Sequence, residues 1–208
     1  MYYGLVYYPQ FDPELRELID EIRRRHDPTV QRSKPHITVL FPVPDSEGES
    51  QLISHIQSVL SDWSPFEIRL GGFHKSDDHW LFLTLTEGES QVKQLYRSLY
   101  TGILEKYRGD DTAMRKFVPH LGLGLFMKKG SIYDWDNPQE ADFDRHAYEE
   151  ALQQAKGLPL SSSYVMDKFH LMAIPDEVLD WATGKRASIP SDSQSTEVWE
   201  FLLARKGA

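Results

Sequence analysis

The stretch KPHITVLF, residues 34–41, places a histidine and a threonine two residues apart in a run of strand-forming apolar residues. Side chains two residues apart point to the same face of a strand. We therefore expect His36 and Thr38 to stand side by side, with their apolar neighbours on the opposite face. An imidazole beside a hydroxyl can belong to a functional site, or the two groups can form a hydrogen-bonded pair in the core. This stretch alone leaves both interpretations open.

A second stretch, VPHLGLGLF at residues 118–126, repeats the pattern with His120 and Gly122. A proline precedes each histidine, and basic residues recur just upstream of both: Arg32, Lys34, Arg115 and Lys116. A single histidine on an apolar strand is usually structural. Two histidines in equivalent positions of a repeat favour a shared site, with the basic residues as a local anion site.

Composition limits the class of protein. The 208 residues are 40% hydrophobic and 26% charged, as in an ordinary globular protein, and there is no cysteine to form disulfides or thiolate metal sites. No apolar run approaches the ~20 residues of a membrane span, and the N-terminus lacks the pattern of a signal peptide. The net charge of −9 argues against binding long nucleic acid by charge alone. We expect a cytoplasmic monomer.

The order of elements repeats along the chain. The first half is expected to contain a strand, a helix that begins at Pro13 after Asp12, the His36 strand, a helix and a strand, the last two at 50–61 and 66–73. The second half is expected to repeat this order at 79–86, 89–104, 118–126, 143–155 and 163–174, with a loop at 182–193 and a final strand at 195–203. These patterns predict an α+β fold with two pseudo-symmetric lobes, near 1–78 and 79–208, within one bilobed domain; strands exchanged between lobes are allowed.

Other polar and aromatic residues allow weaker interpretations. The run Arg23–Arg25 lies at the negative end of a helix dipole and is expected to be a solvated helix end. His74 and His79 flank two aspartates, and a polar hairpin turn explains them better than a metal site. His170 is expected on a strand, in a structural role. Phe41 and Trp80 are candidates to stack on a base, although core packing is the commoner role of strand aromatics.

The chain resembles the two-histidine (2H) phosphoesterases, which carry two H-x-[ST]-x motifs about one lobe apart. The segment 36–39, HITV, matches the first motif fully. The segment 120–123, HLGL, lies 84 residues later and matches the second except at Gly122, where threonine or serine is expected. The resemblance extends to the 2′-5′ RNA ligase-like proteins and cyclic nucleotide phosphodiesterases. It implies two antiparallel sheets, helices on their outer faces, and the histidines facing each other across a central cleft.

The resemblance also implies metal-free and cofactor-free cleavage of 2′,3′-cyclic phosphates, or of nucleotide or RNA-end phosphodiesters, in RNA processing. In-line displacement at phosphorus needs a base and an acid on opposite sides, and histidine can be either near neutral pH. The expected catalytic residues are His36, Thr38 and His120, and the expected substrate-binding residues are Gly122, Phe41, Trp80 and Arg115. Which histidine is the base stays open. The alternative function is a nucleotide or RNA-end binding protein with little turnover, which the glycine at 122 favours.

Overall fold

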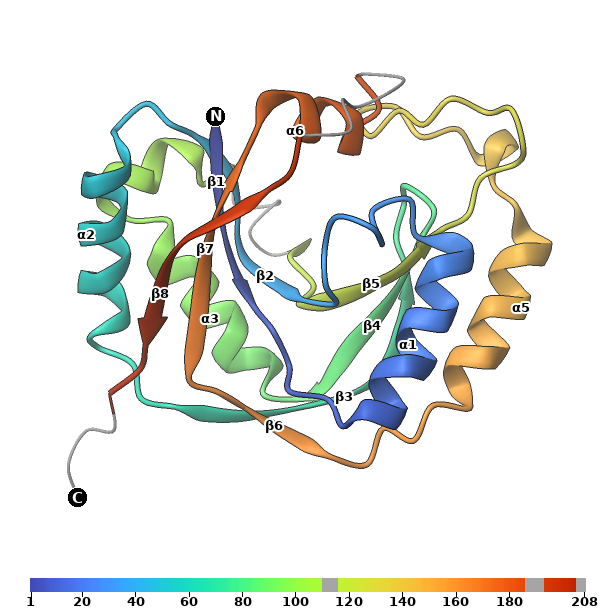
Figure 1. Ribbon diagram of the computed structural model, residues 1–208, viewed down its shortest axis with the longest axis horizontal. Coiled ribbons are helices and arrows are strands. Elements are labelled where there is room, and N and C mark those ends of the chain that lie inside the picture. Colours follow the sequence, from blue (N-terminus) through green and yellow to red (C-terminus); the bar gives the residue numbers. More distant parts are fainter. Residues whose placement is uncertain (110–115, 186–192, 205–208) are drawn as a thin grey trace.

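The computed structural model describes residues 1–109, 116–185 and 193–204. Its strands form two antiparallel four-stranded sheets (Figure 1). Sheet A has the order β2-β1-β7-β8, formed by Ile37–Pro44, Tyr2–Tyr7, Lys168–Ile174 and Thr196–Leu202. Sheet B has the order β5-β4-β3-β6, formed by His120–Leu125, Trp80–Glu87, Phe66–Lys75 and Ser163–Met166. The α+β class with two antiparallel sheets, expected from the sequence, is confirmed.

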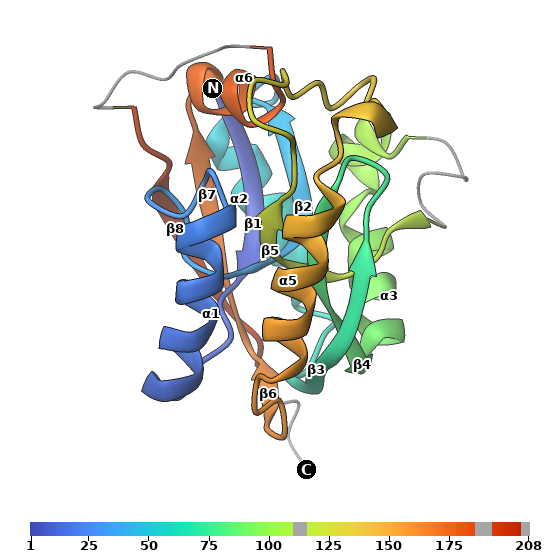
Figure 2. The ribbon, with the colours of Figure 1, turned by 90° about the vertical axis from the view of Figure 1, so that its right-hand side faces the viewer.

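Helices flank the sheets on their outer sides (Figures 1 and 2). The α-helices are α1 Pro13–His26, α2 Glu49–Leu60, α3 Glu89–Leu99, α5 Arg145–Lys156 and α6 Asp176–Ala182. Two 3₁₀ helices, η1 Gly102–Tyr107 and η2 Glu140–Asp142, lie between α3 and α5 in the sequence. Helix α1 contacts β5 and α5, whereas α3 contacts β2 and α2. Each of these two helices therefore packs on the sheet opposite to that of the strand before it.

Each sheet takes strands from both halves of the sequence. Strand β3 belongs to sheet B because a tight hairpin joins it to β4, with the backbone N–H of Ser76 bonded to the carbonyl of Trp80 at 3.0 Å. Strands β7 and β8 complete sheet A. The single strand expected at 163–174 is wrong: it breaks at Asp167 into β6 and β7, which lie in different sheets. Alternation alone carries no signal for such a break, because both pieces have the same period.

One face of each sheet is apolar and the other is mixed. In sheet A, Leu5, Ile37 and Leu171 are fully buried in the core, and in sheet B, Leu83 and Leu121 are as well. The residues between them in β2 and β5 are only partly buried. The hydrophobic period of two thus fixes which side chains can reach the space between the sheets. None of the helices in the described ranges is long and apolar enough to cross a membrane.

Helix α1 begins as its sequence predicts. The side chain of Asp12 accepts a hydrogen bond from the backbone N–H of Leu15 at 2.9 Å, and Pro13 occupies the first turn. The expectation that Arg23 is solvated is wrong, since this residue is only 2% exposed. Arg24 and Arg25 are exposed, as expected, and pair with Glu17 and Glu21.

Candidate functional site

Both motif histidines are held in the same way by the backbone. His36 immediately precedes β2, rather than lying within it as expected, and its Nδ1 is 2.8 Å from the carbonyl oxygen of Lys34. His120 is the first residue of β5, and its Nδ1 is 2.7 Å from the carbonyl oxygen of Val118. A carbonyl can only accept, so the proton of each neutral ring must sit on Nδ1. Each Nε2 then carries the lone pair.

The strands that carry these imidazoles meet between the sheets. Strand β2 contacts β5, and the two lie next to each other at the centre of the molecule (Figure 1). His36 is near enough for its charge to help lower the pKa of His120. Thr38 and Gly122 follow on the same faces of their strands, partly buried like the histidines. Residues 84 apart in sequence are thus brought together by the contact of two edge strands.

The environment favours the neutral form of both imidazoles. Burial is the largest cause of the lowered pKa of His36, which Arg23 lowers further while the bond to Lys34 and the charge of Asp27 oppose the shift. Burial also lowers the pKa of His120 to about 4, opposed by the bond to Val118. Desolvation disfavours the charged form of a base, which gives the direction of both shifts.

Aromatic rings surround the imidazoles. The ring of Phe82, on β4, stacks on His120 with centroids 3.6 Å apart and planes at 18°. His74 stacks more distantly on the same phenyl ring, at 6.4 Å. Tyr8 approaches His36 edge-on, with centroids 6.2 Å apart. The stacked phenyl ring covers one face of His120 and contributes to its desolvation, and sequence reasoning missed Phe82, although it lies two residues from Trp80 on the same strand.

Trp80 lies beside Gly122. A β-carbon built on Gly122 would lie 3.5 Å and 3.6 Å from two carbons of the indole, which is ordinary van der Waals contact. The indole N–H points to the hydroxyl of Tyr133 at 3.4 Å, and that hydroxyl donates to Asp78 at 2.9 Å. The indole therefore occupies the space next to the position where the second motif would carry a threonine side chain.

Phe41 does not lie with the other candidates. Its ring packs edge-on against Tyr96 and Phe117, at centroid distances of 6.1 Å and 5.9 Å, and its backbone N–H donates to the hydroxyl of Tyr100. These contacts correspond to packing between β2 and α3.

The remaining candidate residues from the sequence are Thr38, Arg115, Lys116 and His79, and their surroundings differ. The hydroxyl of Thr38 makes no hydrogen bond within the described part of the chain, so it is available to a ligand. Arg115 lies outside the described residues, and Lys116 is exposed. His79 is buried, with Nε2 2.9 Å from the carbonyl oxygen of Gln139, in the turn that the sequence predicts.

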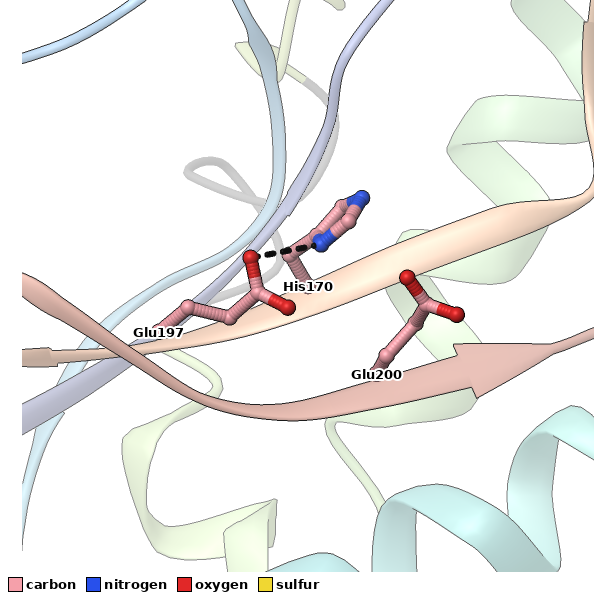
Figure 3. A group of neighbouring side chains, drawn as sticks. All are labelled: His170, Glu197 and Glu200. Carbon is pink, nitrogen blue, oxygen red and sulfur yellow. Dashed lines mark ion pairs between the residues drawn. The ribbon is translucent and has the colours of Figure 1, made fainter.

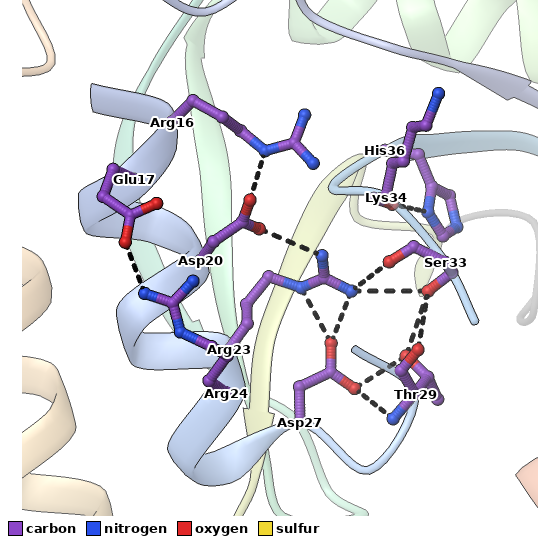
Figure 4. A network of polar contacts seen from close by, with 10 residues as sticks. All are labelled: Arg16, Glu17, Asp20, Arg23, Arg24, Asp27, Thr29, Ser33, Lys34 and His36. Carbon is purple, nitrogen blue, oxygen red and sulfur yellow. Dashed lines mark hydrogen bonds and ion pairs between the residues drawn. The ribbon is translucent and has the colours of Figure 1, made fainter. Parts of the chain in front are cut away.

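A buried ion pair supports the segment that leads to His36 (Figure 4). Arg23 and Asp27 are 2% and 5% exposed, and their side chains approach to 2.7 Å. The guanidinium also donates to the carbonyl oxygen of Ser33 at 2.8 Å, and Asp27 accepts from the backbone N–H of Thr29 at 2.7 Å. The next residue, Lys34, supplies the carbonyl that fixes His36. The i,i+4 spacing of Arg23 and Asp27 was a signal in the sequence.

One group of side chains has the composition of a metal site (Figure 3). His170, Glu197 and Glu200 offer ligand atoms within 4.8 Å of one another. His170 Nδ1 is 3.0 Å from Glu197, but the ammonium of Lys168 lies 3.0 Å from Glu200. A divalent cation would have to compete with this lysine for the carboxylate, so these residues fit a surface ion-pair network better than a metal centre.

Comparison with known proteins identifies a family that matches most of this chain. The family model described as the 2′-5′ RNA ligase superfamily matches residues 11–172. A Bacillus licheniformis protein named "Putative phosphoesterase" is 25% identical over 174 residues, covering 83% of this chain and 89% of its own length. A protein of the same name from Halalkalibacterium halodurans is 28% identical over 143 residues, covering 64% of this chain and 75% of its own.

The fold has relatives among solved structures. The structure of E. coli LigT in its apo form has a TM-score of 0.51 and 16% identity, with 98% of each chain covered. The same protein has been solved with 3′-AMP, at a TM-score of 0.51 and 16% identity, covering 99% of this chain and 100% of that one. The two histidine motifs, the paired antiparallel sheets and a family match across most of the described residues all agree. This chain belongs to the 2′-5′ RNA ligase superfamily.

Proposed function

We propose that this protein is a metal-independent phosphodiesterase in which His36 and His120 are the two proton-transfer groups. The observation that supports it most is their matched geometry: each Nδ1 is bonded to a backbone carbonyl two residues upstream. With Nδ1 fixed, each Nε2 accepts a proton when its own ring is neutral and donates one when its own ring is charged. These are the two roles that in-line displacement at phosphorus requires.

The proposed substrate is a 2′,3′-cyclic phosphate or a related nucleotide or RNA-end phosphodiester. LigT structures hold 3′-AMP and NADP⁺, which supports nucleotides as the ligand class. One imidazole takes the proton of the attacking water as the other protonates the leaving ribose oxygen. The Thr38 hydroxyl then stabilises the charge on a non-bridging oxygen. Gly122 provides no such hydroxyl, and Arg115 or Lys116 is a candidate to replace it.

The test is hydrolysis of adenosine 2′,3′-cyclic phosphate and of a short RNA ending in a cyclic phosphate, with EDTA present. We expect turnover in EDTA and its near-complete loss in His36→Ala and in His120→Ala, because the acid and the base act as a unit. The control is His146→Ala, an exposed histidine on α5 whose side chain is 85% exposed. Full turnover in either motif variant contradicts the proposal, as does loss of turnover on adding EDTA.

A second candidate function follows from Gly122. With one hydroxyl missing and the indole of Trp80 beside the gap, the same scaffold can bind a nucleotide or RNA end with little turnover. Tight binding of the cyclic phosphate without hydrolysis, abolished in His120→Ala, would favour this candidate over the enzyme.

A further inference from the structure

A pocket of about 350 Å³ lies next to the segment that holds His36. It is formed by one side of α1 and by the loop that runs from Val30 to Lys34. Its charged lining residues are Arg16, Asp20, Arg23, Arg24, Arg32 and Lys34. The carbonyl of Lys34 is the group that fixes Nδ1 of His36. The same residue therefore lines the pocket and positions the imidazole.

Positive charge predominates in this pocket. Five cationic side chains line it, whereas the carboxylates at or beside it are those of Asp20, Asp27 and Glu17. The chain as a whole has a net charge of −9, so the pocket is a local reversal of sign. A concave site lined by one sign of charge concentrates ligands of the opposite sign. The expected ligand is therefore an anion.

Two of the cations have donors available for that anion (Figure 4). Arg16 pairs with Asp20 through Nε at 2.6 Å, and its terminal nitrogens extend toward the side of Lys34. The ammonium of Lys34 makes no hydrogen bond or ion pair with the described residues, and Lys34 is exposed. A guanidinium and an ammonium on opposite sides of a pocket are the usual partners of a phosphate group.

We infer that this pocket binds a second phosphate group of the substrate, one nucleotide step away from the phosphorus that reacts. The inference rests on the proposed function, because it takes His36 to mark the reacting phosphate. Lys34 and His36 are two residues apart, a span of at most ~7 Å in extended chain. That span is comparable to the separation of neighbouring phosphates along a strand. The preferred substrate is therefore an oligonucleotide end or a nucleotide with a further phosphate.

The experiment compares the affinities of product-like probes, so that it does not depend on turnover. Calorimetry measures the Kd of adenosine 3′-monophosphate, of adenosine 3′,5′-bisphosphate, and of an ApA dinucleotide with a 3′-phosphate. The same titrations are made with Arg16→Gln and Lys34→Gln. The matched control is Arg25→Gln, an arginine on the same helix that pairs with Glu21 and does not line the pocket.

We expect either probe with a second phosphate group to bind about tenfold more tightly than the monophosphate, the effect of one charge-assisted contact. Arg16→Gln and Lys34→Gln should bring this ratio close to one, and Arg25→Gln should keep it. A gain with the bisphosphate assigns the pocket to a terminal phosphate, and a gain with the dinucleotide alone assigns it to an internal phosphodiester. Equal affinity for all three probes overturns the inference. So does a gain that Arg25→Gln reduces as much as Arg16→Gln does.

The result separates the two proposals. If adenosine 2′,3′-cyclic phosphate is not hydrolysed but the affinity ratio behaves as expected, the catalytic proposal fails and the anion pocket stands. If the cyclic phosphate is hydrolysed and the ratio is one for every variant, the catalytic proposal stands and the pocket fails.

Discussion

Phe82 and His120 stack face to face, with ring centroids 3.6 Å apart and planes at 18°. The phenyl ring excludes water from one face of the imidazole. Burial is the largest cause of the low pKa of His120, which is about 4. A residue from the neighbouring strand is thus part of the surroundings that bury this histidine.

Replacing Phe82 should raise the pKa of His120. In Phe82→Ala, water reaches the imidazole and stabilises its charged form, so the pKa should move up toward its ordinary value. The measurement is a titration of the His120 ring protons by NMR. Phe41→Leu serves as the control, because Phe41 packs against Tyr96 and Phe117 and should leave the titration unchanged. An unaltered titration in Phe82→Ala would show that other groups bury His120.

The pH dependence of kcat/KM should have its maximum on the acidic side. The proposed mechanism needs one charged and one neutral imidazole, and the pKa values of both His36 and His120 are lowered. Above ~6.5, the ordinary histidine pKa, both rings are neutral and the acid is lacking. The rate should rise as pH falls below that value and decline again once both rings are charged, and the pKa of about 4 for His120 marks the range in which its own ring titrates. A plateau extending from pH 7 to 9 would contradict this.

Gly122→Thr tests whether the glycine lost a phosphate donor or made room for another group. The backbone accepts a β-carbon at ordinary distance from Trp80, so Gly122→Ala should be as stable as the parent or more so. The γ atoms of threonine extend farther and compete with the indole for space. We therefore expect Gly122→Thr to raise kcat, by up to ~10²-fold for one oxyanion donor, only when combined with Trp80→Leu.

Kinetics on one cyclic phosphate distinguish these accounts. A higher kcat in the double variant than in Trp80→Leu alone supports a lost donor. A lower kcat with a raised KM in both threonine variants supports a glycine that makes room for substrate.

Arg23→Met should destabilise the protein and impair catalysis together. It leaves Asp27 buried without its cation, and a broken buried pair costs about 3–5 kcal/mol. It also removes the donor that holds the carbonyl of Ser33, next to the residue that orients His36. The free energy of unfolding is measured in urea. The double variant Arg23→Met with Asp27→Leu should regain much of the stability but not kcat, since the loop stays unanchored. Recovery of both would limit Arg23 to a stabilising role.

Much of this molecule could be predicted from local sequence. The alternation around His36 and His120, the cap formed by Asp12 and the apolar spacing of the helices depend on neighbours within a few residues, so the elements and their buried faces were predictable. The repeat also related the two histidines, and the family followed from that relation. The hydrogen bond from each Nδ1 is local as well, because its partner is the carbonyl of the residue two positions before the histidine.

The remaining features depend on contacts between residues far apart in sequence. The break at Asp167 is decided by which sheet each half of the segment completes, and the apolar alternation is the same on both sides of the break. The local sequence predicts Arg23 as a solvated helix end, and only the loop that folds back brings the carbonyl of Ser33 to its guanidinium beside Asp27. The burial that lowers the pKa of His120 depends on residues such as Phe82 from a neighbouring strand, because desolvation is a property of packed surroundings. The sequence determined which side chains are able to transfer protons. Only the tertiary structure decided how far they are buried from water, how near they lie to each other and which contacts hold them in place.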